Sequence, residues 1–138
     1  MDSAARRRST AALGVMGSET FARQLVYLAS TSLQERFGAR ATRDEYVLLD
    51  EVLERASDCV RMVTSNHPMA AKLPAKVRAA ILALEPRLSD NKFSRLSWIE
   101  AIGDPDWKAL REQAASVFAA MGISLAEWEQ RELRGHDA

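Results

Sequence analysis

Residues 104–122 read DPDWKALREQAASVFAAMG, and this stretch contains every signal of a helix from its start to its end. Asp104 followed by Pro105 is typical of a helix start, because aspartate caps free N–H groups and proline fits the first helical position. Gly122 is typical of a helix stop. Between them, apolar residues recur at spacings of three and four and predict one buried face. The residues of that face are Trp107, Leu110, Ala114, Val117 and Met121.

Similar patterns lie on both sides of this stretch. A capping box, Ser124 with Glu127, predicts a last helix with Leu125, Trp128 and Leu133 facing inward. Four helices are predicted upstream, over 18–38, 42–66, 73–85 and 91–103.

Two of the upstream helices carry predictions about single side chains. Thr42 and Glu45 form a capping box that predicts the start of the second helix, with Tyr46 on its inward face. In 91–103, the spacing of Phe93, Leu96, Ile99 and Ile102 predicts an inward stripe that leaves Trp98 at its edge.

The fold class follows from these patterns. No alternation with a period of two persists, and no Asn-Gly or Asp-Gly hairpin turn occurs. We predict an all-α protein, a single compact bundle of five to six helices whose first two helices form an antiparallel hairpin. The expected organisation is a flexible basic arm over 1–17, a helical domain over 18–134 and a tail over 135–138.

Composition limits the class of protein. The chain has 138 residues, of which 47% are hydrophobic and 28% charged, which suits one globular domain. No apolar run approaches the roughly 18 residues of a membrane span, so no membrane association is expected. A single cysteine, Cys59, excludes an internal disulfide and suits a reducing, cytoplasmic setting. Abundant arginine and alanine indicate a GC-rich genome, and we expect a bacterial or phage origin.

Charge is segregated along the chain although the formal net charge is zero. The blocks 1–43, 44–67, 68–95 and 96–138 carry +4, −4, +4 and −4. The third block is the best candidate surface for an anionic partner, with the N-terminal arm in reserve. Its candidate residues are Lys72, Lys76, Arg78, Arg87, Lys92 and Arg95, and those of the arm are Arg6, Arg7 and Arg8. The acidic last helices could instead pair with this block inside the chain.

Catalytic signals are weak. His67 precedes Pro68 at a helix end, where a capping role is expected, and Cys59 lies on an apolar face, where an inert thiol is expected. The acidic face of the second helix, Asp44, Glu51, Glu54 and Asp58, has no matching carboxylate pair elsewhere that would complete a metal site. No catalytic residue, metal site or cofactor is predicted.

One short segment resembles a known DNA-binding family. Gly122, Ile123 and Ser124 resemble the turn of a helix-turn-helix, which implies that the last helix enters a DNA groove. The family has alanine where this chain has Phe118, and the would-be recognition helix carries Glu127, Glu129 and Glu132. Those acidic residues disfavour a groove lined with phosphates.

We therefore expect a non-enzymatic protein that acts by binding, as an interaction subunit or regulator of a larger complex. The expected partner is another protein or a second copy of the chain, with Trp98 as a candidate anchor. The alternative is a nucleic-acid-binding protein, a ribonucleoprotein subunit or repressor, that uses the basic 72–95 face.

Overall fold

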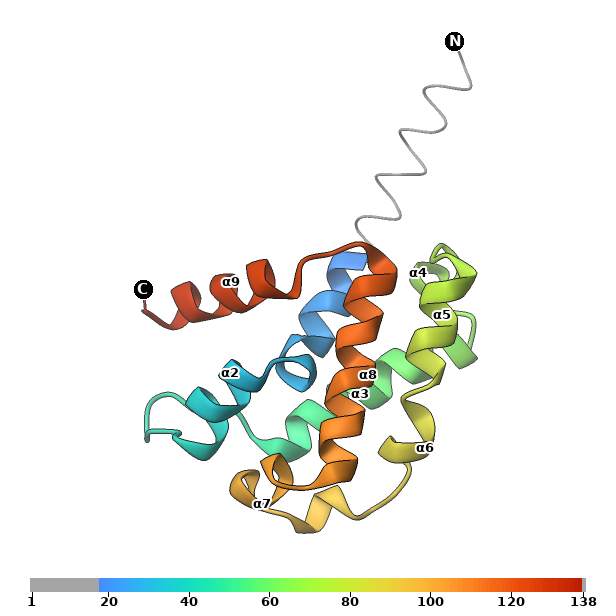
Figure 1. Cartoon of the computed structure of the whole chain (residues 1–138). Helices are drawn as coiled ribbons and strands as arrows, with labels where there is room; N and C mark the ends of the chain where they lie inside the picture. Colours follow the sequence, from blue (N-terminus) through green and yellow to red (C-terminus); the bar gives the residue numbers. More distant parts are fainter. Residues whose placement is uncertain (1–17, 138) are drawn as a thin grey trace.

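The computed structural model describes residues 18–137, and side chains up to Gly135. Within this range the chain is helical and has no strand, which confirms the predicted all-α class (Figure 1). The arm over 1–17, with Arg6, Arg7 and Arg8, lies outside the described residues.

The helices are more numerous and shorter than the five to six predicted. A helical segment over 18–29 is followed by α2 (Thr31–Gln34) and the π-helix η1 (Glu35–Ala39). The remaining elements are α3 (Leu49–Thr64), α4 (Pro68–Ala71), α5 (Ala75–Leu82), α6 (Glu85–Leu88), the 3₁₀ helix η2 (Phe93–Arg95), α7 (Trp98–Ile102), α8 (Pro105–Met121) and α9 (Leu125–Asp137). The last of these continues into the predicted tail.

Helix α8 organises the domain, and its predicted limits are confirmed. The Asp104 carboxylate accepts a hydrogen bond from the N–H of Asp106 at 2.8 Å, and Pro105 is the first helical residue. The helix ends where Gly122 adopts the left-handed conformation, with φ of 70°. Trp107 and Leu110 are among its fully buried side chains, and α8 packs against α5, α7 and α9 (Figure 1).

The predicted first helix is interrupted at Ser30, whose backbone is extended. Gln34, 1% exposed, satisfies the interior groups at this break. Its Nε2 donates to the carbonyl oxygens of Tyr27 at 2.8 Å and Leu28 at 2.7 Å, while its Oε1 accepts from Trp107 Nε1 at 3.0 Å. A buried side-chain amide thus replaces helical hydrogen bonds and joins the N-terminal segment to α8.

The second helix begins at Leu49, so the predicted start at Thr42 is wrong. Thr42 and Glu45 do bond reciprocally, but within a loop: the N–H of each contacts an oxygen of the other at 3.1 and 3.2 Å. The helix starts later than predicted because both backbone groups of Val47 are hydrogen-bonded to other elements. Its N–H donates to the carbonyl of Phe37 at 2.9 Å, and its own carbonyl accepts from Trp98 Nε1 at 2.8 Å.

The predicted antiparallel hairpin of the first two helices is not confirmed. Helix α3 packs against α4, α5 and α6, whereas α2 packs against η1 and α9. Because of the break at Ser30 and the loop before α3, the two predicted helices are not joined by the short link that was expected.

The predicted helix over 91–103 is also divided, because Leu96 is extended between η2 and α7. A capping box starts α7 anew: the N–H of Glu100 donates to Ser97 Oγ at 3.2 Å, and the N–H of Ser97 donates to Glu100 Oε1 at 3.1 Å. This restart shifts the helical phase. Ile99 is therefore exposed, and its predicted inward position is wrong, whereas Trp98 is half-buried against the core.

Candidate interaction surfaces

Cys59 and His67 carry groups that often take part in catalysis, but both have structural roles in this fold. Cys59 is fully buried in α3, and burial, followed by the nearby Asp58 carboxylate, raises the pKa of its thiol to about 12. His67 caps α4, with its Nδ1 accepting a hydrogen bond from the N–H of Met69 at 3.2 Å. A neutral thiol and a capping imidazole match the inert roles predicted for these residues.

Acidic residues of α3 are paired along their own helix. Glu51 contacts Arg55 at 2.6 Å, and Asp58 pairs with Arg61. Across residues 18–137, no three potential metal-ligating side chains come together, and no helix is long and apolar enough to span a bilayer.

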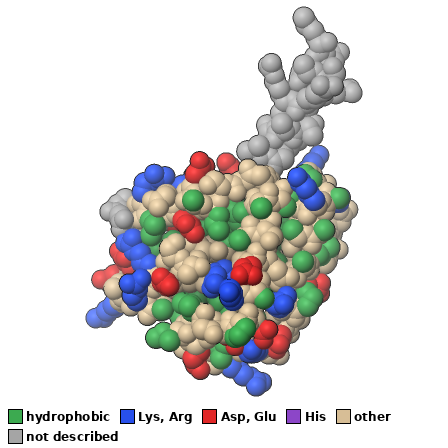
Figure 2. Space-filling view, viewed as in Figure 1, with side chains coloured by type: hydrophobic (Ala, Val, Ile, Leu, Met, Phe, Trp, Pro, Cys, Tyr) green, Lys and Arg blue, Asp and Glu red, His purple; other side chains and the backbone are tan. Residues whose placement is uncertain are grey.

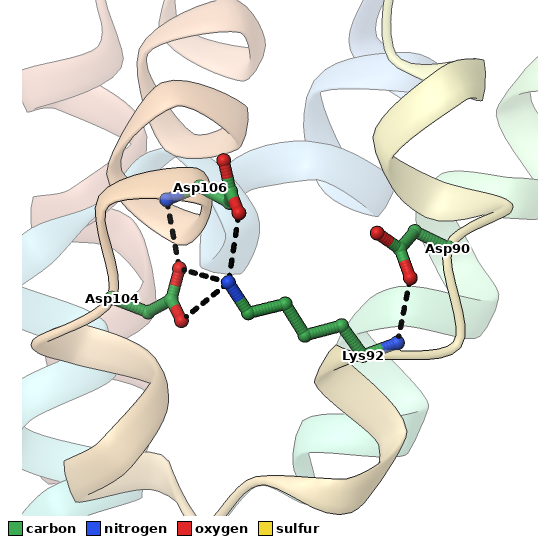
Figure 3. A network of polar contacts seen from close by, with 4 residues as sticks. All are labelled: Asp90, Lys92, Asp104 and Asp106. Carbon is green, nitrogen blue, oxygen red and sulfur yellow. Dashed lines mark hydrogen bonds and ion pairs between the residues drawn. The ribbon is translucent and has the colours of Figure 1, made fainter.

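Helix α8 neutralises part of the basic block. Lys92 Nζ lies 2.9 Å from Asp104 and 2.8 Å from Asp106, at the start of α8 (Figure 3). Hydrogen bonds to Asp106 and Asp104 raise the pKa of Lys92, and the bond from Lys92 lowers the pKa of Asp104. Arg87 Nη1 donates to Gln113 Oε1 at 3.1 Å. Helix α8 and its N-cap therefore contact both basic residues, and Lys92 alone is paired with carboxylates.

The other four basic residues are divided between two ends of the molecule. Lys72 ends α4, and Lys76 and Arg78 lie on α5, whereas Arg95 belongs to η2. Figure 1 shows η2, by its colour, at the opposite end from α4. On the face shown in Figure 2, basic and acidic side chains are interspersed, with apolar side chains between them. The block over 72–95 is therefore not one continuous basic face.

Trp98 has an intramolecular role. Besides the hydrogen bond to Val47, its ring packs edge-to-face on Trp107, with centroids 5.8 Å apart. The ring also lies against Gly38, where an added Cβ would come within 2.5 Å of it. Trp98 is half-buried, as a residue at the edge of an apolar stripe can be, and these contacts hold its ring between the loop before α3 and the core.

Three large apolar side chains are exposed next to Val47 and Trp98 in the sequence. Tyr46 is 57% exposed, Leu48 58% and Ile99 71%. We refer to these three residues as the 46/48/99 patch. The two segments that carry it, the loop before α3 and the start of α7, are joined by the hydrogen bond between Trp98 and Val47.

A shallow groove of about 280 Å³ adjoins the patch. Ile99 lines both, so the apolar surface continues from α7 toward η1. The groove floor also includes Ala39 and Ile102, and an ion pair between Arg40 and Glu35, at 3.6 Å, lies along it. Its charged border carries both signs.

The turn that resembles a helix-turn-helix has the expected local geometry. After Gly122, Ser124 Oγ accepts a hydrogen bond from the N–H of Glu127 at 3.2 Å, which caps α9. Phe118 is buried, and Trp128 of α9 packs into the core. The Tyr27 hydroxyl also donates to Glu132 at 2.9 Å, which ties α9 to the first helical segment. Each of these contacts has a structural role.

Sequence reasoning missed the 46/48/99 patch, although one local signal points to Ile99. Tyr46, Val47 and Leu48 are all apolar, so the sequence does not distinguish the exposed residues of this segment from the half-buried one. The Ser97-to-Glu100 capping box fixes the phase of α7 and with it the outward direction of Ile99.

Comparisons of this chain with protein-family models, with curated proteins and with solved structures give no match.

Proposed function

We propose that this chain acts by binding another protein through the 46/48/99 patch, as a subunit or regulator of a larger complex. One observation carries the proposal: Tyr46, Leu48 and Ile99 are each more than half exposed on two segments that are joined to each other. Single exposed apolar residues are common on proteins, but neighbouring ones with an adjacent groove are typical of binding surfaces.

The patch is held in place before any partner arrives. Both backbone groups of Val47 are hydrogen-bonded, and the ring that holds its carbonyl is packed on Trp107. A surface that is already ordered loses little conformational entropy on binding, so more of the contact energy becomes affinity. Burying the exposed part of each side chain supplies about 1 to 2 kcal/mol. Tyrosine is also enriched among the residues that dominate protein interfaces.

The surface favours a protein over a nucleic acid. The centre of the patch is apolar, and the basic Arg40 at its border is paired with Glu35. Nucleic-acid surfaces instead present unpaired basic residues along the phosphate backbone. We therefore infer that the partner presents apolar side chains, such as one face of an amphipathic helix, to Ile99 and the groove beside it.

The test compares two variants of equal charge as bait in cells of the native host. Leu48→Asp with Ile99→Asp changes the patch, whereas Ala119→Asp with Ala126→Asp changes exposed positions on α8 and α9. We expect the wild type and the control pair to retain the same protein, in a fixed stoichiometry, and the patch pair to lose it. Equal retention by both pairs would contradict the proposal. Equal unfolding curves for both pairs would show that the loss is not a folding defect.

A further inference from the structure

Helix α5 has an apolar character on both of its sides. Val77 and Ile81 face inward and are fully buried against α3 and α8. On the opposite side Leu82 is 37% exposed, and Ala79 and Ala83 beside it are exposed as well. A helix at a protein surface normally carries polar side chains on its outer face.

The charged residues of α4 and α5 are all basic, and the first acidic residue after them is the exposed Glu85 at the start of α6. The chain has no acidic residue between Asp58 and Glu85, a span that holds all of α4 and α5. Lys72 and Lys76 are exposed and Arg78 is half-buried. Figure 2 shows basic side chains at the upper right, where Figure 1 places α4, with no acidic side chain beside them in that view.

The neighbouring elements leave these three basic residues unneutralised. Among the described residues, the carboxylates of α3 that form ion pairs do so with Arg55 and Arg61 of their own helix, and those at the start of α8 pair with Lys92. No ion pair joins Lys72, Lys76 or Arg78 to an acid in the described part of the chain.

We infer that the surface formed by Lys72, Lys76, Arg78 and Leu82 docks a helical protein segment that carries carboxylates beside an apolar stripe. The apolar stripe lies on Leu82 and the alanines, and the carboxylates pair with the basic residues at the border. The basic N-terminal arm of this chain is not the occupant, because it has the same charge as the surface. A nucleic acid fits less well, because an apolar centre offers no donor to phosphates and no aromatic ring to stack on a base.

This surface does not depend on the 46/48/99 patch. The two lie on different elements, α4 and α5 against the loop before α3 and α7, and Figure 1 shows α4 and α7 at opposite ends of the molecule. A chain with both surfaces would join two partners. Because different variants disable the two surfaces, the proposal for one surface can be refuted while the proposal for the other stands.

The inference is tested with defined probes and fluorescence anisotropy. The first probe is an amphipathic helical peptide of about 20 residues with leucines along one face and glutamates on both flanks, and its twin has lysine in place of each glutamate. A DNA duplex and phosphatidylserine vesicles are the other probes. The protein is used as the wild type, as Lys72→Glu with Lys76→Glu, as Leu82→Asp, and as Arg95→Glu with Lys108→Glu, a control of equal charge change at exposed positions.

We expect the wild type to bind the glutamate peptide and not the lysine twin. Both the lysine pair and the Leu82 variant should weaken binding by about tenfold, whereas the control pair should change it by less than about twofold. Equal binding of both peptides, or equal weakening by the control pair, would overturn the inference. So would tighter binding of the duplex or the vesicles, or a dimer that the lysine pair dissociates. Thermal unfolding of each variant verifies that it is folded.

Discussion

The buried amide of Gln34 offers the sharpest test of how this fold is held together. Replacing it with leucine keeps the volume roughly constant but removes all three hydrogen bonds, to the carbonyls of Tyr27 and Leu28 and from the indole of Trp107. Each buried polar group left without a partner costs about 1–3 kcal/mol. Three such groups, less the gain from burying a more apolar side chain, give a loss of about 3 kcal/mol in the free energy of unfolding.

That loss is large against the stability of an ordinary domain, about 5–15 kcal/mol, and is readily measured. Urea unfolding followed by circular dichroism and by tryptophan fluorescence gives the difference. Gln130→Leu, at an exposed position of α9, is the matched control and should change the free energy by less than about 0.5 kcal/mol. Gln34→Glu should also destabilise, because a carboxylate accepts from Trp107 but cannot donate to the two carbonyls. A Gln34→Leu protein within 1 kcal/mol of the wild type would refute the reasoning.

Three further changes probe other contacts. Gly38→Ala should lower the unfolding free energy by about 1–3 kcal/mol, since the added Cβ would overlap the ring of Trp98; thermal unfolding gives the value. Lys92→Met should lower the unfolding free energy at neutral pH. Because Lys92 lowers the pKa of Asp104 in the folded state, the difference in unfolding free energy from the wild type should shrink as the pH falls through that lowered pKa. Urea unfolding of both proteins at pH 7 and at about pH 3 measures this difference. Cys59, with a pKa of about 12, should react with a disulfide reagent at pH 8 only as the protein unfolds, which a spectrophotometric rate measures.

Each of the three changes, at Gly38, Lys92 and Cys59, has a control in the same chain. Gly103→Ala should be tolerated, because the nearest atom to its added Cβ is 3.7 Å away. Arg95→Met removes an exposed charge near Lys92 and should show no comparable dependence on pH. A Cys59 that reacts at the same rate in the folded and unfolded protein would contradict its burial, and equal losses for the two glycine variants would contradict the contact with Trp98.

Local signals predicted part of this fold well. The limits of α8 and the start of α9 follow from caps, a proline and a glycine that lie next to the helices they define. A capping box alone did not suffice at Thr42. There the loop is decided by Val47, whose carbonyl is held by Trp98, a residue 51 positions away. Such a contact has no local sequence pattern.

The candidate surfaces, too, could be predicted only in part from the sequence. Sequence identified the basic residues, but only the fold shows that Lys92 is paired with Asp104 and Asp106 while Lys72 and Lys76 are not. The 46/48/99 patch was missed because the phase of α7 depends on where that helix restarts. Ile99 was assigned to the core by extending a stripe through Leu96, at which the chain is extended.

The central claim is that the 46/48/99 patch contacts a protein. A photo-crosslinking amino acid at position 48, introduced in cells of the native host, tests it most directly, with the same amino acid at position 108 of α8 as the control. We predict one crosslinked protein of discrete mass from position 48, absent from position 108 and lost when Ile99→Asp is added. Crosslinks of equal pattern from both positions, or a product at position 48 that Ile99→Asp leaves unchanged, would contradict the account.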